Sequence, residues 1–478
     1  MHEEPTGMRL GGHHIHFVGI GGVGMSSLAQ LALDNGAVVS GCDAKDSPVL
    51  RTLAARGCRV FIGHDPAHLD GVELVVCSSA IPDTAPELLA AHQRFLPVVG
   101  RARMLARFAN PYRLVAIAGA HGKTTTTWIA AKLLIEAHLD PSVMIGGMVD
   151  ELDGNYRLGS GPFFVTEADE SDGSLIEFEP QYSIVTNIDH EHVDRYPDLA
   201  SLQETFRRFL RRTRPGGCVI ACSDSEPAVE ALDAWGGQAA TYGFGPQAQF
   251  RAENVRANGA SSTFDVRRPT GTLHGLTVTL PGLHNVQNAL AGVALAHVLG
   301  IGDDVLRRAL GAIASVGRRL EKKGVAGGVT MFDDYGHHPT EIRVTLGAAR
   351  GMATGRLLAV FQPHRYSRTY YLCERFGDCF DGLDHLVLLP IYAAGEPPLD
   401  GVSTRWIERA VHARGHVDCQ CFDDWGAARR HLLGLLRPGD TLLTIGAGDV
   451  YRFGEQLLAE LEQRGAQAPS AQQELERQ

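Results

Sequence analysis

The sequence lacks any run of about 20 apolar residues, the length that crosses a membrane as a helix. Its start, MHEEPTGMRLGGHH, carries two acidic residues and has no apolar segment of the kind found in secretion signals. We therefore expect a cytoplasmic protein with no membrane partner.

Positive charge is also in short supply. There are 44 lysines and arginines against 55 aspartates and glutamates, giving a net charge of -11 and an isoelectric point near 6.0. A chain of this charge has no overall attraction for nucleic acid, although a local basic pocket for phosphate remains open.

Cysteine is scarce, with nine residues in 478. None forms the C-x₂-C pair of a zinc ribbon, and several lie in apolar runs, such as Cys77, Cys218 and Cys222. We expect reduced thiols that are mostly core residues.

The chain has no short internal repeat, and its length predicts several domains. At 478 residues it is about three times as long as a typical domain. Hydrophobic residues make up 44% and charged residues 21%, as in ordinary globular proteins.

Three segments alternate strand-like and helix-like runs, which predicts α/β domains with parallel sheets. The expected domains are residues 1–109, 110–317 and 318–464, the first and third Rossmann-like and the second built around a phosphate loop. Residues 465–478 lose apolar periodicity and are expected to be disordered.

A first glycine-rich motif, GIGGVGM, stands between a predicted strand and a predicted helix. Gly19, Gly21 and Gly24 have G-x-G-x-x-G spacing, and Asp43 ends the next strand. Such a turn lets backbone N–H groups approach a pyrophosphate at a helix N-terminus. From the residues alone, a nicotinamide or flavin dinucleotide is the leading ligand, and a turn without a ligand is the alternative.

A second motif, GAHGKTTT, follows the buried run RLVAIA and predicts a phosphate loop. Lys123 would face the β- and γ-phosphate oxygens, and the Thr124 hydroxyl would ligate Mg²⁺. Ile117 stands where the common nucleotide-binding loop has its first glycine, which disfavours an ordinary kinase or GTPase. An exposed lysine on a glycine-rich turn is the alternative.

Acidic and imidazole groups follow two further predicted strands, FFVTEAD and YSIVTNID. Because the carboxyl ends of parallel strands share one sheet edge, these groups are expected near the phosphate loop, where they would hold Mg²⁺. They are Glu167, Asp169, Glu170, Asp172, Asp189, His190, Glu191, His192 and Asp194.

The third segment places histidine and arginine in DDYGHHPTE and FQPHRYSRT. Because guanidinium binds carboxylate through two hydrogen bonds, these motifs predict a carboxylate pocket. A structural salt-bridge cluster is the alternative.

Taken together, these motifs resemble the Mur ligase family over residues 15–461, because they occur in the family's order. PGLHNVQNA and IYAAGE add to the resemblance, and the third-segment motifs are similar to the branch that joins L-alanine to UDP-N-acetylmuramate. The resemblance implies a UDP-sugar rather than a dinucleotide at the Gly19 turn.

The resemblance also implies the site residues. The implied catalytic residues are Lys123, Glu167 and His192, and the implied Mg²⁺ ligands are Thr124, Glu167 and His192. Those implied for ATP are Gly119, Ala120, His121, Gly122, Lys123, Thr124, Thr125, Asn285, Asn288, Arg319 and Asp334. Those implied for the UDP-sugar are Gly19, Gly21, Gly22, Gly24, Met25, Asp43, Ser78 and Ser79. Those implied for the amino acid are Tyr335, His337, His364, Arg365 and Arg368.

The family's chemistry implies ATP and Mg²⁺, with Mn²⁺ as a substitute, and small-molecule substrates bound by a monomer or weak homodimer. The substrate carboxylate would attack ATP to give an acyl phosphate, which an amino-acid amine then captures. Ala120 stands where the family commonly has threonine, and no lysine lies between His192 and Gly217, where sibling ligases keep one.

Four other functions remain as alternatives. A peptide-recycling ligase would use the same UDP-sugar with a tripeptide, and a folylpolyglutamate-type ligase would lack the N-terminal UDP domain. A nicotinamide oxidoreductase would leave GAHGKTTT unused, and a UDP-sugar-binding regulator would bind without turning over ATP.

Overall fold

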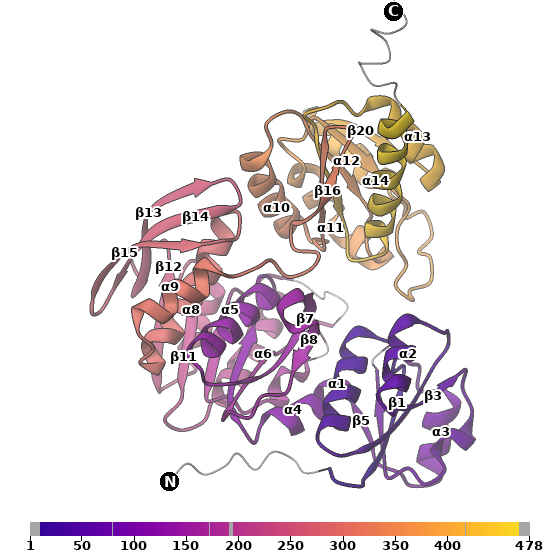
Figure 1. Ribbon diagram of the computed structural model, residues 1–478, viewed down its shortest axis with the longest axis vertical. Coiled ribbons are helices and arrows are strands. Elements are labelled where there is room, and N and C mark those ends of the chain that lie inside the picture. Colours follow the sequence, from indigo (N-terminus) through magenta and orange to yellow (C-terminus); the bar gives the residue numbers. More distant parts are fainter. Residues whose placement is uncertain (1–9, 79, 172, 191–194, 416, 468–478) are drawn as a thin grey trace, which may run out of the picture. The chain divides into compact units, whose positions relative to one another are not determined.

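The computed structural model describes residues 10–78, 80–171, 173–190, 195–415 and 417–467. It divides into two compact units. Figure 1 shows its helices and strands, coloured along the sequence. Unit 1 contains residues 1–255, 264–278 and 286–314, and unit 2 contains 256–263, 279–285 and 315–478. Among the described residues the strands form three sheets, which confirms the predicted α/β class.

The N-terminal sheet has the order β3-β2-β1-β4-β5, with all neighbours parallel. Its strands are β1 (His14–Val18), β2 (Val38–Asp43), β3 (Arg59–Ile62), β4 (Leu74–Cys77) and β5 (Val98–Gly100). Helices α1 (Val23–Asp34), α2 (Pro48–Ala55) and α4 (Arg101–Ala109) pack on one face, and α3 (Pro86–Gln93) and η1 (Pro66–Leu69) pack on the other. Alternate residues of β1 therefore enter different layers, Phe17 facing α1 and Val18 facing α3.

The central sheet has the order β15-β14-β13-β12-β11-β10-β6-β9-β7-β8. Its strands are β6 (Arg113–Ala118), β7 (Ser142–Val149), β8 (Gly154–Arg157), β9 (Phe163–Glu167), β10 (Tyr182–Val185), β11 (Cys218–Cys222), β12 (Gln238–Gly243), β13 (Phe250–Asn258), β14 (Ser261–Arg268) and β15 (Gly271–Val278). Its helical elements are α5 (Lys123–Glu136), η2 (Asp150–Leu152), η3 (Ser174–Glu177), α6 (Leu199–Arg211), α7 (Glu226–Leu232), α8 (Leu283–Leu299) and α9 (Asp303–Gly311). Because β6 is parallel to both β9 and β10, the residues after these three strands share one sheet edge.

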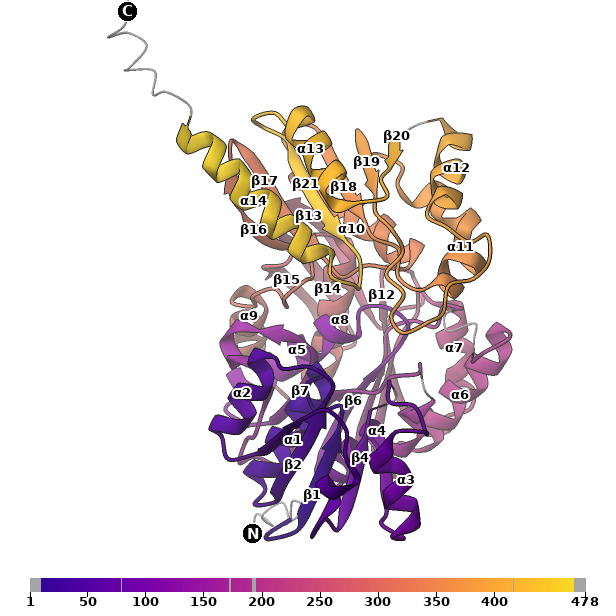
Figure 2. The same ribbon diagram turned by 90° about the vertical axis from the view of Figure 1, so that its right-hand side faces the viewer.

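The C-terminal sheet has the order β16-β17-β21-β18-β19-β20. Its strands are β16 (Glu321–Ala326), β17 (Val329–Asp334), β18 (Leu357–Phe361), β19 (His385–Leu388), β20 (Asp418–Cys421) and β21 (Thr441–Ile445). Helices α10 (Pro339–Met352), α11 (Tyr366–Cys379) and α12 (Arg405–Arg414) cover one face, and α13 (Trp425–Leu435) and α14 (Val450–Gln467) cover the other (Figure 2). Leu357 and Phe361 of β18 face the first layer, while Leu358 and Val360 face the second, so both faces of this strand are buried.

Each of the three sheets begins inside a different one of the three predicted domains. The exact limits of these domains remain a prediction from the sequence. Helix α14 extends to Gln467, three residues into the tail expected to be disordered, and residues 468–478 lie outside the described residues. Among the described residues, no helix combines the length and apolar character needed to cross a membrane.

Candidate active site

The phosphate-loop motif forms the turn between β6 and α5. Gly119 and Gly122 have φ angles of 141° and 80°, which side chains other than glycine rarely adopt. A Cβ at Gly119 would lie 2.1 Å from Thr186 Oγ1. The chain therefore needs glycine here for conformation and for space, and the turn delivers the N-terminus of α5 to the sheet edge, where the helix dipole favours a phosphate.

The residues after β10 hold this loop in shape. The backbone N–H of His121 donates to Asn187 Oδ1 at 2.9 Å, and Asn187 Nδ2 donates back to the His121 carbonyl at 2.9 Å. The Ala120 N–H donates to the Asn187 carbonyl at 3.2 Å. Asn187 therefore holds the loop in its folded shape, because it satisfies the N–H groups of Ala120 and His121 and the carbonyl of His121.

Lys123 is the first residue of α5, and its ammonium group folds back over the loop. Nζ donates to the Gly119 carbonyl at 2.6 Å and to Glu170 Oε2 at 2.8 Å, with Asp169 Oδ1 at 3.8 Å. The Glu170 side chain is 1% exposed. A buried carboxylate therefore positions the lysine charge at the mouth of the loop.

The predicted metal ligands lie close along this edge where they are described. Thr124 is the second residue of α5 and is buried, while Glu167 ends β9, the strand beside β6. The Gly146 N–H donates to Glu167 Oε1 at 2.6 Å. Hydroxyl and carboxylate oxygens are the donors that Mg²⁺ prefers, so these residues fit the ion. His192 lies outside the described residues.

The two asparagines predicted for ATP have different surroundings. Asn288 accepts a hydrogen bond from Thr126 Oγ1 at 3.3 Å, and its Oδ1 would lie 2.7 Å from a Cβ at Gly122, so it borders the phosphate loop. Asn285, in the first turn of α8, donates to the Pro281 carbonyl at 2.7 Å.

The first glycine-rich motif forms the turn from β1 to α1. Gly19 has a φ of 79°, and the Asp43 carboxylate accepts the Gly21 N–H at 2.9 Å. Ser78 lies beside this turn, since its Cβ is 3.3 Å from a Cβ built at Gly19. Met25 points into the core, so it has only backbone to offer a ligand, and Ser79 lies outside the described residues.

Unit 1 contains a cavity of about 220 Å³ that begins at the first glycine-rich motif and ends at acidic residues after β9. It reaches from Gly24, at the start of α1, to Glu167 and Asp169 beside the phosphate loop. The remaining lining residues are Val23, Arg101, Ala102, Leu105, Met144, Ile145, Gly146, Asn155, Thr166 and Phe178. A ligand bound beside Gly24 can therefore reach Glu167, the carboxylate predicted to bind Mg²⁺.

Arg101 was missed by the sequence reasoning. It is the first residue of α4, and its guanidinium Nη1 would be 3.3 Å from a Cβ at Gly24, which keeps position 24 small. Its sequence signal was weak, because GRARM is not a recognised binding motif and only the packing of α4 against α1 brings it to the cavity.

In unit 2, the residues predicted for the amino acid gather where β17 and β18 end. The ring of His337 lies 5.6 Å from that of Tyr335 and 5.9 Å from that of His364, between ring centres. Arg368 Nη1 lies 3.1 Å from His364 Nδ1. Tyr392, from the IYAAGE motif, stacks on His364 with a centre distance of 5.6 Å.

The electrostatics of this cluster keep its imidazoles neutral. Burial and the guanidinium groups of Arg368, Arg365 and Arg318 lower the pKa of His364 to about 3. Burial, with Arg368, also lowers the pKa of His337 well below its usual value. Positive charge is therefore carried by arginine, which suits a pocket for a carboxylate.

The loop after β18 is constrained by Arg365, whose φ of 73° is unusual for a side-chain-bearing residue. Glu396 contacts this loop: its Oε1 atom accepts a hydrogen bond from Ser367 Oγ at 2.6 Å and lies 3.8 Å from Arg365 Nη1. The strained residue thus begins α11 at a fixed place in the pocket.

Arg319 and Asp334, predicted for ATP, lie near this cluster. Arg319 lies 5.4 Å from the centre of the Tyr335 ring, and Asp334 accepts from the backbone of Leu320 and Gly336 at 2.8 Å each. Arg318, also missed from sequence, donates to Asp333 at 2.8 Å and to the Gly446 carbonyl at 2.6 Å. It ties β17 to the loop after β21.

The first unit therefore combines a phosphate loop, a half-buried lysine and strand-end carboxylates with a second glycine-rich turn, all at the ends of parallel strands. This combination defines an enzyme class that uses a nucleoside triphosphate and a second phosphate-bearing ligand.

The chain belongs to the Mur ligase family, whose members are ATP-dependent ligases. Residues 14–113 match the family's "catalytic domain", 117–296 its "middle domain" and 318–448 its "glutamate ligase domain". It is 44% identical over 453 residues to a UDP-N-acetylmuramate–L-alanine ligase of Desulfosudis oleivorans, covering 95% of this chain and 99% of that protein. A ligase of the same name from Desulfatibacillum aliphaticivorans is 45% identical, with 94% and 98% coverage.

Solved structures of related ligases have the same fold as this chain. The UDP-N-acetylmuramate-alanine ligase of Thermotoga maritima superimposes with a TM-score of 0.80 at 27% identity, over 94% of this chain and 99% of that one. A murein peptide ligase from Psychrobacter arcticus gives a TM-score of 0.68 at 26% identity, with the same coverages.

Proposed function

We propose that this protein is an ATP-dependent ligase that joins L-alanine to the carboxylate of UDP-N-acetylmuramate, a step in making peptidoglycan precursors. The observation that carries the proposal is the cavity that runs from Val23 and Gly24, after the first glycine-rich turn, to Glu167 and Asp169. Asp169 Oδ1 lies 3.8 Å from Nζ of Lys123 in the phosphate-loop motif. The relatives that share 44–45% of its residues over nearly the whole chain bear the same activity in their names.

We propose that ATP binds to residues 119–125, with its phosphates at the N-terminus of α5. Lys123 is held against Glu170, a contact that keeps its charge beside the loop until phosphate oxygens replace the carboxylate. Asn288 borders the loop, and Asn285, Arg319 and Asp334 are the further nucleotide residues we propose.

Mg²⁺, with Mn²⁺ as a substitute, would be held by Thr124, Glu167 and His192 and would neutralise charge on the transferring phosphoryl group. Glu167 is oriented for this by the Gly146 N–H. Lys123 adds a second positive charge on the same phosphoryl oxygens.

The UDP-sugar is placed on the Gly19 turn, where the glycines bring backbone N–H groups to the diphosphate. We also assign to this UDP-sugar site the residues that border the turn, which are Gly21, Gly22, Gly24, Asp43, Ser78 and the backbone of Met25. Ser79 belongs to the same proposed set. Arg101 is the cationic side chain on the cavity wall, and we assign it to the phosphate or carboxylate of the sugar nucleotide.

The reaction then has two steps. The sugar carboxylate attacks the γ-phosphorus of ATP, which breaks the bond to ADP and gives an acyl phosphate. The amine of L-alanine attacks the acyl carbon, loses a proton and expels phosphate. Arg365 and Arg368 would hold the alanine carboxylate, and Tyr335, His337 and His364 would shape a pocket for its small side chain.

The protein should work as a monomer or weak homodimer in the cytoplasm, where its nucleotide substrate is made. Phosphate release would be measured with ATP, Mg²⁺ and UDP-N-acetylmuramate, and with no acceptor, L-alanine, glycine, L-serine or the recycling tripeptide. We expect turnover that requires L-alanine. Turnover with the tripeptide alone would assign the protein to the peptide-recycling branch, and binding without turnover would make it a regulator.

A further inference from the structure

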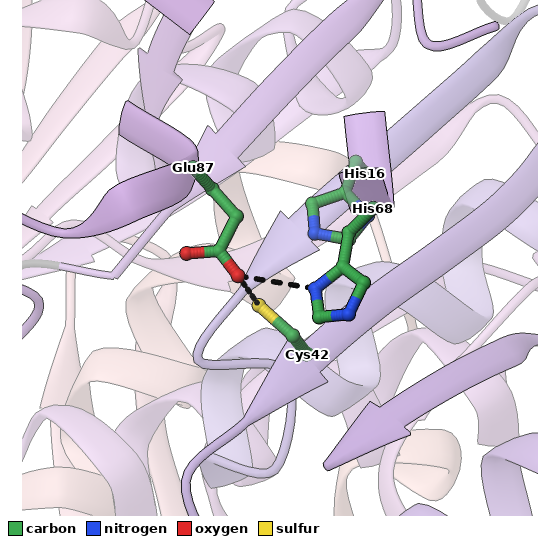
Figure 3. Close-up of side chains that lie close together, drawn as sticks. All are labelled: His16, Cys42, His68 and Glu87. Atoms are coloured by element: carbon green, nitrogen blue, oxygen red, sulfur yellow. Dashed lines mark hydrogen bonds and ion pairs between the residues drawn. The ribbon is translucent and has the colours of Figure 1, made fainter. Parts of the chain in front are cut away.

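A cluster of metal-binding side chains lies in the N-terminal sheet, on the face covered by α3 and η1, and the proposed ligase chemistry makes no use of it. His16 comes from β1, Cys42 from β2, His68 from η1 and Glu87 from α3. Figure 3 shows the four side chains turned toward one another. One ligand atom from each lies within 4.8 Å of the ligand atoms of the other three.

The spacing within the cluster matches a four-coordinate metal site. Cys42 Sγ lies 3.2 Å from Glu87 Oε1, and His68 Nδ1 lies 3.1 Å from the same oxygen. Zinc bonds of about 2.0 Å to nitrogen or oxygen and about 2.3 Å to sulfur put tetrahedral ligand atoms roughly 3.3 to 3.5 Å apart. The two contacts are slightly shorter than this spacing and the other ligand atoms lie within 4.8 Å of one another, so side-chain adjustment around an ion would complete the geometry.

His16 supplies a second and independent sign of a ligand. It is fully buried, and its Nε2 atom has no hydrogen-bond partner within the described part of the chain. Its Nδ1 atom lies 2.9 Å from Ser40 Oγ. If Nδ1–H donates to that hydroxyl, the lone pair stays on Nε2, as in imidazole ligands of metals, which are usually oriented in this way.

The charge balance also fits a divalent ion. Glu87 is fully buried, and its carboxylate is stabilised there by hydrogen-bond partners on Cys42, His64, Asp65 and His68. A divalent ion bound to one thiolate, one carboxylate and two neutral imidazoles gives a neutral site. His64 Nδ1, 3.0 Å from Glu87 Oε2, and the Asp65 N–H, 3.0 Å from Oε1, would orient the carboxylate from outside.

From this geometry we infer that His16, Cys42, His68 and Glu87 form a structural site for a divalent transition-metal ion, with Zn²⁺ as the best match to the sulfur, nitrogen and oxygen donors. Binding releases the Cys42 thiol proton to solvent and leaves the thiolate on the metal. The ion would join two strands to the two elements that cover them, and so stabilise the N-terminal domain without taking part in ligation.

The test uses full-length protein freed of metal by a chelator and titrated with Co²⁺ and with Zn²⁺. We expect one tight ion per chain and a thiolate-to-cobalt charge-transfer band. This band separates the site from the magnesium site, because the segments TEADESDGS and TNIDHEHVDRY and the phosphate loop contain no cysteine.

Cys42→Ala should abolish the band and weaken Zn²⁺ binding by more than about tenfold, and Ser40→Ala should keep the band but weaken binding about 10- to 100-fold. Cys58→Ser, a buried cysteine in the same domain but outside the cluster, is the matched control and should change neither. A missing cobalt band in the folded wild type, or a band unchanged by Cys42→Ala, would overturn the inference. Turnover with L-alanine is measured separately, so failure of the metal site leaves the ligase proposal untouched.

Discussion

Arg101 shows how much one side chain can contribute to the proposed sugar-nucleotide site. It is a guanidinium on the wall of a small cavity, beside Gly24. A hydrogen bond to a charged group contributes about 1.5 to 3 kcal/mol, so Arg101→Ala should raise KM for UDP-N-acetylmuramate about 10- to 100-fold and leave KM for ATP nearly unchanged.

The matched control is Arg103→Ala, two positions along α4, where the side chain is 60% exposed and pairs with Glu177. Steady-state kinetics with each substrate varied in turn would distinguish the two. Equal effects of both variants would remove Arg101 from the site.

Asp334 gives a prediction about pH. Burial raises its pKa to about 6 from the ordinary value of 3.8, so the folded protein holds this proton more tightly than the unfolded chain. The stabilisation from this group is therefore full below pH 3.8 and is lost as pH rises through 6, by up to about 3 kcal/mol.

Asp334→Asn removes that titration. The free energy of unfolding of the wild type, measured relative to the variant by chemical denaturation, should fall between pH 5 and pH 7.5. A difference between the two proteins that stays constant over this range would contradict the prediction.

At the scale of elements, the turn from β6 to α5 depends on what the neighbouring strand places against it. Gly119→Ala would put a methyl group 2.1 Å from Thr186 Oγ1 at a φ of 141°. We expect loss of about 1–3 kcal/mol of stability and a large loss of kcat, since the loop must move away from its phosphate-binding shape.

The control Gly216→Ala introduces backbone strain without a steric clash, and so distinguishes the two effects expected in Gly119→Ala. Gly216 also has a positive φ, of 76°, but no atom lies within 4 Å of an added Cβ. Thermal denaturation and turnover should show a mild stability loss and normal activity there. Normal activity in Gly119→Ala would mean that the loop does not hold the phosphates.

For the whole molecule, the chemistry requires the two compact units to cooperate. The phosphate-loop motif belongs to unit 1, and the residues that we propose for the amino acid belong to unit 2. In the proposed reaction the amine would have to reach an acyl phosphate formed on the loop. We predict an open and a closed state, with closure favoured by nucleotide and UDP-sugar together.

Solution scattering with a non-hydrolysable ATP analogue and UDP-N-acetylmuramate should show a smaller radius of gyration than the free protein, and each ligand alone should have a lesser effect. The same radius in all four samples would count against closure.

Much of this protein was determined by the sequence itself. The short, continuous apolar run RLVAIA predicted a buried parallel strand, because a strand covered on both faces is apolar throughout. The glycine spacing of GAHGKTTT predicted the phosphate turn, because residues other than glycine rarely adopt the φ angles of 141° and 80° found there. Local conformation and short spacing carry such signals.

Contacts between distant segments were decided only by the tertiary structure. Lys123 pairs with Glu170, Arg101 borders Gly24, and His16 meets Cys42 and Glu87, across separations that no motif spans. Each depends on which strands are neighbours, which face a side chain takes and which helix covers that face. Those choices follow from packing the whole sheet, since a shift of one residue in a strand would turn every one of its side chains to the opposite layer.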